Sequence, residues 1–127
     1  MFLDEYLPFL PTNTIVTHAP TVPGRSRKRG YDQAALIAKK FAQKRGLSYA
    51  PLLVRLGVGR QLGLSRSERF KHAAGSFRLS AIAHVKGDTI LVIDDVLTTG
   101  ATLEAAAQTL RSAGARHVDG AVFAQKL

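Results

Sequence analysis

The stretch from Thr89 to Thr102, TILVIDDVLTTGAT, limits the possible folds of this chain more than any other segment. Residues 89–93 form a short β-branched, apolar run, which is typical of a strand buried on both faces of a parallel sheet. Two acids, Asp94 and Asp95, follow at its carboxyl end. Ligands bind at that edge of open parallel sheets. Two adjacent acids at this edge therefore indicate a binding role, because folding alone does not require them there. The stretch predicts an α/β fold with a ligand site beyond this strand.

A small, hydroxyl-rich segment, residues 98–102, follows the acids and leads into a helical pattern. The predicted helix has an apolar face made of Leu103, Ala106, Ala107, Leu110 and Ala113, and a polar face made of Glu104, Gln108 and Arg111. The start of such a helix offers unpaired backbone N–H groups and hydroxyl donors to a phosphate. The helix dipole contributes only about 0.3–2 kcal/mol, so several donors must act together. The simpler alternative is that residues 98–102 cap the helix and the two acids form a solvated strand end.

Residues 90–102 also resemble the ribose-5-phosphate-binding signature of type I phosphoribosyltransferases. That signature is an apolar run, two acids, two further residues, Thr-Thr-Gly and another Thr. The resemblance implies that Asp94 and Asp95 hold the ribose hydroxyls of phosphoribosyl pyrophosphate. It implies that the 5-phosphate is bound by the residues that follow, Val96, Leu97, Thr98, Thr99, Gly100, Ala101 and Thr102. A Walker-type G-x-x-x-x-G-K-[ST] loop does not occur in the chain.

Length and composition predict one soluble domain, residues 1–127, with residues 1–13 as an N-terminal extension. The chain has 127 residues, 46% of them hydrophobic and 21% charged, which suits a modest core. No apolar run reaches the about 18 residues needed to cross a bilayer. The absence of cysteine excludes disulfides and thiolate zinc sites, and we expect a cytoplasmic protein.

The net charge of +9 is concentrated in one part of the chain. Residues 25–78 contain 14 of the 18 Lys and Arg residues, opposed there only by Asp32 and Glu68. Such an imbalance predicts a polyanionic partner, either a highly phosphorylated small molecule or a nucleic acid. Charge alone does not separate these two partners.

The remaining pattern predicts an open, mostly parallel sheet of four to five strands flanked by helices. Residues 14–17, 52–56 and 117–124 are the other expected core strands, with 52–56 as the second in order. A helix is expected to begin near Asp32, a plausible N-cap, and to end at Gly46. Its buried side should contain Tyr31, Ala34, Ala35, Ala38, Phe41 and Ala42, with Lys39, Lys40 and Lys44 outside.

Residues 18–24 are expected to form the loop after the first strand, because they are rich in proline and glycine. In type I phosphoribosyltransferases this loop binds pyrophosphate, which implies that role for Pro20, Thr21 and Val22, with Arg29 close by. His18 has two interpretations, a group facing the ligand or simply a strand-end residue.

Two further segments resemble the ComF type, a competence-protein-like group of phosphoribosyltransferases. Residues 29–33, Arg-Gly-Tyr-Asp-Gln, match its pattern except at Asp32, where the ComF type usually has Asn. Residues 57–74 are expected to form a flexible loop that closes over the reacting centre and excludes water. The family positions there are Gln61, Leu64, Ser65, Arg69, Gly75 and Phe77, with His72 in place of the usual Asn. The alternative is a solvated loop followed by a short helix over 67–73. The ComF type commonly has an N-terminal cysteine-rich zinc module, and we expect this chain to lack it, because the sequence contains no cysteine.

The resemblance implies a reaction in which pyrophosphate leaves the anomeric carbon through a cation-like transition state. Arg60, Arg66 and Arg69 are the candidates for charge on the leaving group, and Mg²⁺ would sit on pyrophosphate and ribose oxygens without direct protein ligands. The acceptor stays unassigned. The second hypothesis is a non-enzymatic competence and DNA-uptake accessory module. It would bind nucleic acid through residues 25–78 or contact a protein of the competence machinery.

Overall fold

Strand β5 (Thr89–Asp95) lies inside the principal sheet and has no exposed apolar face. Its residues 90–93 are all 0% exposed. Apolar side chains that alternate to both sides of a strand must be covered on both sides, so β5 requires a helix on each face. The structure, a computed structural model, describes residues 10–20, 33–56, 77–95 and 100–123. The predicted strand 89–93 is confirmed, and it continues through both acids.

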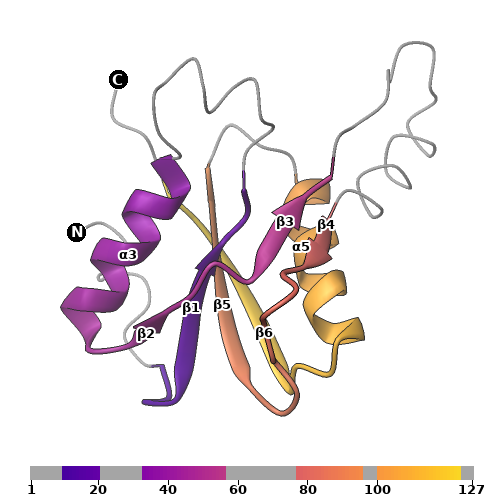
Figure 1. Ribbon diagram of the computed structural model, residues 1–127. Helices are drawn as coiled ribbons and strands as arrows, with labels where there is room; N and C mark the ends of the chain where they lie inside the picture. Colours follow the sequence, from indigo (N-terminus) through magenta and orange to yellow (C-terminus); the bar gives the residue numbers. More distant parts are fainter. Residues whose placement is uncertain (1–9, 21–32, 57–76, 96–99, 124–127) are drawn as a thin grey trace.

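The principal sheet has four strands in the order β2-β1-β5-β6, and every neighbouring pair is parallel (Figure 1). β1 (Thr14–His18) pairs with the first five residues of β5, and β6 (His117–Phe123) pairs with all of it. The short β2 (Ser48–Tyr49) completes the other edge beside β1. The predicted open parallel α/β sheet and its strand at 14–17 are confirmed, and the predicted strand 117–124 is confirmed through Phe123, since Ala124 lies outside the described residues.

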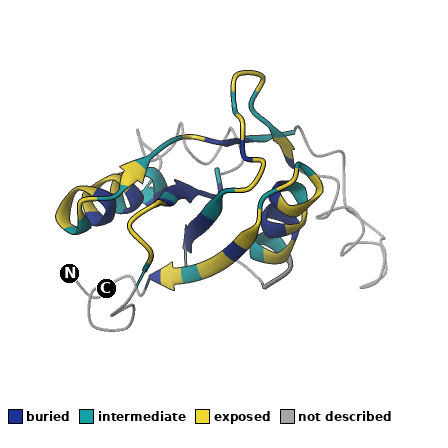
Figure 2. Ribbon diagram, turned by 90° about the horizontal axis from the view of Figure 1, so that it is seen from below, coloured by how far each residue is buried: buried dark blue, intermediate teal, exposed yellow. Residues whose placement is uncertain are grey.

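Among the described residues, one helix covers each face of this sheet. α3 (Gln33–Arg45) connects β1 to β2 across one face, and α5 (Gly100–Ser112) connects β5 to β6 across the other (Figure 1). Seen from below, buried residues gather in the middle strands, while the outer sides of the helices and much of β6 are exposed (Figure 2).

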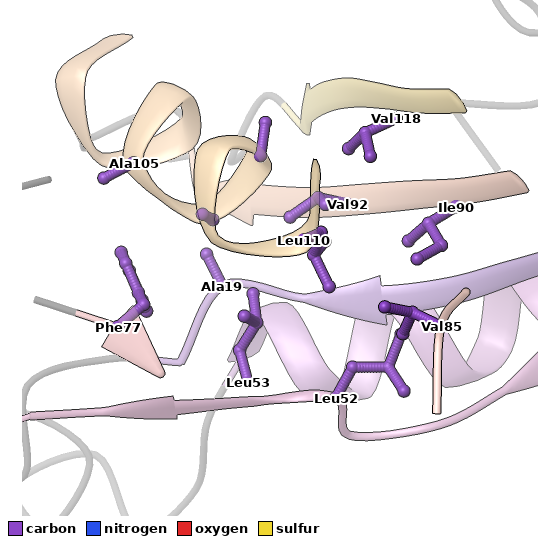
Figure 3. Packing of buried hydrophobic residues seen from close by; sticks show 12 residues of the cluster. Ala19, Leu52, Leu53, Phe77, Val85, Ile90, Val92, Ala105, Leu110 and Val118 are labelled. Atoms are coloured by element: carbon purple, nitrogen blue, oxygen red, sulfur yellow. The ribbon is translucent and has the colours of Figure 1, made fainter. Parts of the chain in front are cut away.

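Each face holds its own hydrophobic cluster. The α3-side cluster consists of Val16, Ala34, Ala38, Phe41, Ala42, Leu91, Ile93 and Phe123. The α5-side cluster, shown in Figure 3, consists of Ala19, Leu52, Leu53, Phe77, Val85, Ile90, Val92, Ala105, Ala106, Ala107, Leu110 and Val118. Full burial of one large apolar side chain contributes about 1.5–3 kcal/mol, so the two clusters supply the main driving force for this fold. The described residues of both predicted apolar faces face the sheet, although Ala35, Leu103 and Ala113 are only half-buried.

The prediction that residues 52–56 form the second core strand is wrong. Only β3 (Leu53–Arg55) is a strand there, and it pairs antiparallel with β4 (Phe77–Leu79) in a separate two-stranded sheet. The neighbour of β1 is β2 instead. Leu53 and Phe77 are the residues of this small sheet that pack in the α5-side cluster (Figure 3). A short apolar run suits either sheet equally well, because both bury its side chains.

Glycines end both helices. Gly46 follows α3 with φ +68°, and Gly114 follows α5 with φ +102°, as expected at helix C-termini. The predicted N-cap Asp32, the helix residue Tyr31 and the loop 57–74 lie outside the described residues. Nowhere in the described part of the chain is a helix both long and apolar enough to span a membrane.

Candidate functional site

The direction of the chain across the sheet reverses between β1 and β5. From β1 the chain passes through α3 to β2 on one side, and from β5 it passes through α5 to β6 on the other. The carboxyl ends of β1 and β5 therefore lie side by side while their connections diverge, and both helices begin at this edge (Figure 1). Crevices at such reversals are the ligand sites of open α/β sheets.

Asp94 and Asp95 are the last two residues of β5 and stand at this edge. β6 still pairs beside them, whereas the pairing of β1 ends at Ile93. Asp94 is 2% exposed. Water therefore does not solvate this strand end at Asp94, and a carboxylate buried to this extent costs several kcal/mol unless it is paired or hydrogen-bonded. The side chain of Asp95 is outside the described part of the structure.

The first turn of α5 contains the end of the predicted phosphate segment. Gly100, Ala101 and Thr102 are helical, and Thr102 is half-buried. The backbone N–H groups of a first turn have no acceptor within their own helix and face outward along its axis. Here the helix begins at the edge where β5 ends. The other members of the segment, Val96, Leu97, Thr98 and Thr99, lie outside the described residues.

β1 brings the predicted pyrophosphate segment next to the acids. The backbone N–H of Ala19 donates to the Ile93 carbonyl oxygen at 3.0 Å. The chain thus stays beside β5 for one residue past β1, and Pro20 follows at the tip. Thr21, Val22 and Arg29 lie outside the described residues.

Arg55 contributes to this edge from the small sheet. Its Nη1 donates to the Pro20 carbonyl oxygen at 3.3 Å, and its guanidinium carbon is 4.9 Å from the centroid of the Phe77 ring. The residue is half-buried and links β3 to the start of the pyrophosphate segment. Arg55 belongs to none of the motifs in the sequence, although one cation inside the apolar run LLVRL is a usable signal, since arginine is rarely buried without partners.

His18 packs against β2. Its Nδ1 lies 2.8 Å from the Tyr49 hydroxyl, and the two rings are stacked at an angle of 10°. His18 is 8% exposed and is the last residue of β1. This geometry agrees with the strand-end interpretation.

The remaining candidates, Arg60, Arg66 and Arg69, lie outside the described residues. Across the described ranges, no three His, Cys, Asp or Glu side chains gather into a group able to hold a metal ion.

The chain is similar to several known proteins. Residues 30–127 match the family described as the phosphoribosyl transferase domain. Adenine phosphoribosyltransferase of Streptomyces avermitilis is 40% identical over 76 residues, covering 52% of this chain and 42% of the relative. Orotate phosphoribosyltransferase of Pyrobaculum islandicum is 38% identical over 78 residues, covering 61% of this chain and 39% of the relative.

Adenine phosphoribosyltransferase of Serratia proteamaculans is 34% identical over 102 residues, covering 72% of this chain and 52% of the relative. The chain thus spans about half of these relatives or less. A solved structure described as the allosteric regulatory enzyme of purine biosynthesis is similar over 94% of this chain and 23% of its own. Its TM-score is 0.57 and its identity 23%, a likeness of fold alone.

Proposed function

Because the chain belongs to the phosphoribosyl transferase domain family, we propose that it binds 5-phosphoribosyl 1-pyrophosphate and transfers the phosphoribosyl group to an acceptor. The observation that carries this proposal is the buried carboxylate of Asp94 at the reversal between β1 and β5. An acid kept from water at a ligand edge suits a ligand with hydroxyl donors, because charge-assisted hydrogen bonds are the strong ones. Ribose provides two such hydroxyls beside each other.

The ligand would span the crevice with one phosphate group at each end. Its 5-phosphate would meet the first-turn N–H groups of α5 and the hydroxyls of residues 98–102. Its pyrophosphate would lie at the tip of β1, along residues 20–22 and near Arg29. Supporting this orientation, the half-buried guanidinium of Arg55 contacts Pro20 at that end. The ribose then falls over Asp94 and Asp95, between the two strand tips.

In the proposed reaction the bond between the anomeric carbon and the pyrophosphate oxygen breaks, and its electron pair leaves with pyrophosphate. The acceptor supplies the electron pair of the new bond to the same carbon. Such a reaction needs no protein nucleophile, so the task of the chain is to fix the sugar and stabilise charge. Arg60, Arg66 and Arg69 would stabilise the leaving group, and the two acids would favour positive charge on the sugar. The acceptor is unassigned.

Mg²⁺ suits this ligand and this edge. It prefers carboxylate and phosphate oxygens, keeps several waters and is seldom enclosed by protein ligands alone. Asp94 and Asp95 would hold the ribose hydroxyls, so the ion would be carried by the ligand without direct protein ligands. When bound with the ligand, the ion would neutralise part of the leaving group's charge. The residues of the chain would orient that complex.

Calorimetry of phosphoribosyl pyrophosphate with Mg²⁺ tests the proposal. We expect the unsubstituted protein to bind, and the double variant Asp94→Asn, Asp95→Asn to bind at least about tenfold more weakly, since each lost charge-assisted bond is worth about 1.5–3 kcal/mol. The control is Asp88→Asn, Asp119→Asn, which removes the same charge elsewhere. Asp88 precedes β5 at the opposite edge, and Asp119 is exposed in β6.

Equal affinity of both double variants would remove the proposed ribose contacts. A folded, unsubstituted protein that binds no phosphoribosyl pyrophosphate would contradict the function itself.

We also propose that the chain is of the ComF type, which the sequence pattern of residues 29–33 and 61–77 supports. It leads to a second candidate function, a non-enzymatic accessory module of competence and DNA uptake. One observation favours nucleic-acid binding. α3 contains four cations and no acid, namely Lys39, Lys40, Lys44 and Arg45. The three lysines are exposed on the outer side of the helix.

Salt dependence distinguishes the two functions. A DNA oligonucleotide held by lysine–phosphate contacts loses affinity steeply with salt, and each lost contact lowers the slope of log K against log salt by about 1. For the double variant Lys39→Gln, Lys40→Gln, we expect the slope to fall by about 1 for each of the two lost contacts. The control Lys86→Gln, Arg116→Gln removes two exposed cations away from α3. Identical slopes for both pairs would exclude α3 as the nucleic-acid surface.

A further inference from the structure

Gly120 in β6 lies directly under Leu103 of α5. A Cβ atom added at Gly120 would be 2.6 Å from Leu103 Cδ2, 2.8 Å from Cγ and 3.1 Å from Cδ1. Real Cβ atoms essentially never approach another heavy atom below 3.0 Å. The helix therefore touches the strand where the strand has no side chain.

The backbone conformation of Gly120 does not explain the glycine. The described glycines with positive φ are Gly46, Gly87 and Gly114, and Gly120 is not among them. Glycine in a strand interior is unfavourable, because it loses more conformational freedom than other residues and packs no side chain. Such a glycine commonly marks close approach of another element, and here the approaching group is Leu103.

Leu103 belongs to the first turn of α5, one residue after Thr102. It is half-buried and packs against the α5-side cluster. The next buried residues, Ala105, Ala106 and Ala107, have short side chains, so Leu103 is the first long side chain between this end of the helix and the sheet. Farther along, the fully buried Leu110 holds the other end. A side chain at position 120 would therefore have to displace the Leu103 side chain or lift the start of α5, while Leu110 keeps the other end of the helix in place.

We infer that Gly120 is a positioning residue for the 5-phosphate. It sets the height of the first turn of α5 above the sheet through Leu103. The inference rests on the proposed function, because it assigns the phosphate to that turn. The alternative response is a rotation of the Leu103 side chain, but a helical leucine has few permitted rotamers, since χ1 near +60° runs into the preceding turn.

The strand register makes the effect selective. Gly120 pairs with Val92, and Asp94 pairs with Val122 two residues farther along the same strands. Added bulk at position 120 therefore changes the separation between the helix start and the acids, and leaves the acids in place on β5. Affinity for the 5-phosphate end should fall, and affinity for the pyrophosphate end at β1 should not.

The test measures the affinities of Gly120→Ala for two ligands and then restores the lost affinity with a second substitution. For Gly120→Ala we expect the affinity for phosphoribosyl pyrophosphate with Mg²⁺ to fall about tenfold, the equivalent of one lost phosphate hydrogen bond. Affinity for inorganic pyrophosphate with Mg²⁺ should change less than about twofold. Adding Leu103→Ala to Gly120→Ala makes room for the new methyl group and should restore most of the loss, as a coupled pair does in a double-mutant cycle.

Val118→Ala is the matched control, because it removes packing from the same face of β6 without pushing on Leu103. It should lower the melting temperature and leave both affinities unchanged. Unchanged binding of phosphoribosyl pyrophosphate by Gly120→Ala would show that Leu103 yields instead, which overturns the inference. Equal losses for both ligands, or no rescue, would also overturn it. Absence of binding by the unsubstituted protein would contradict the proposed function and this inference with it.

Discussion

Asp94 and Arg55 are charged side chains that two different strands hold at one edge of the sheet. Asp94 is 2% exposed, and the guanidinium of Arg55 is half-buried between the Pro20 carbonyl oxygen and the Phe77 ring. The acid lies at the tip of β5, and the cation reaches the tip of β1. Opposite charges at the two tips suit a ligand that has hydroxyls in its middle and its greatest negative charge at one end.

Arg55→Met tests the contribution of the cation. Methionine keeps most of the contact with Phe77 and removes the donor to Pro20, so the start of the pyrophosphate segment loses an anchor. Given the proposed function, we expect affinity for inorganic pyrophosphate with Mg²⁺ to fall about tenfold in calorimetry, because hydrogen bonds from charged groups are worth about 1.5–3 kcal/mol. Arg45→Met is the control, since Arg45 also lies over an aromatic ring, 5.2 Å from the Phe41 centroid, but at the far end of α3. Similar affinities of both variants would exclude a positioning role for Arg55.

At the scale of elements, the ends of the helices decide where the site lies. α3 and α5 both begin at the carboxyl edge of the sheet and end at glycines at the opposite edge (Figure 1). Gly46 has φ +68°, and nothing lies within 4 Å of an added Cβ atom. The need for glycine there comes from backbone conformation alone.

Gly46→Ala should therefore lower the free energy of unfolding by about 1 kcal/mol, the cost of left-handed backbone reduced by the lower entropy of the unfolded chain. Gly46→Asn should cost less, because asparagine tolerates this conformation. Urea denaturation followed by circular dichroism measures both values. An alanine variant as stable as the unsubstituted protein would mean that α3 ends differently from the structure.

Prediction from sequence succeeded where an element has its own hydrophobic pattern or ends at a glycine. The apolar run of β5, the helical spacing of α5 and the glycine after α3 each mark their element locally. It failed at β2, because two residues, Ser48 and Tyr49, show no period at all. The apolar run at 52–56 was assigned in its place, since a run of leucines does not reveal which sheet buries it.

For the whole molecule, the two hydrophobic clusters share the strands between them. We expect the described elements to unfold as one cooperative unit, in agreement with the predicted single domain. Leu110→Ala on one face and Phe41→Ala on the other should lower the free energy of unfolding by about 2–5 kcal/mol each. Ile82→Ala, at a residue 88% exposed, should change it by less than about 0.5 kcal/mol.

Urea transitions and hydrogen exchange measure this cooperativity. If Phe41→Ala raised exchange only in α3 and left α5 fully protected, the two faces would be separate units and the single-domain prediction would be wrong.

The candidate site was predictable only in part. The acid pair and the helix start are adjacent in the chain, so local spacing reveals them. Arg55 and Gly120 act through contacts with Pro20 and Leu103, far away in sequence, and no local pattern states such contacts. They become visible only when the sheet order and register are known.

The reversal between β1 and β5 also divides the site between two parts of the chain. Pro20 belongs to the part that builds β1, α3 and β2, and Asp94 belongs to the part that builds β5, α5 and β6. Neither part alone carries both ends of the crevice. A chain of this design is suited to a split reporter, in which two separately produced fragments regain the ability to hold a ligand only after they reassemble.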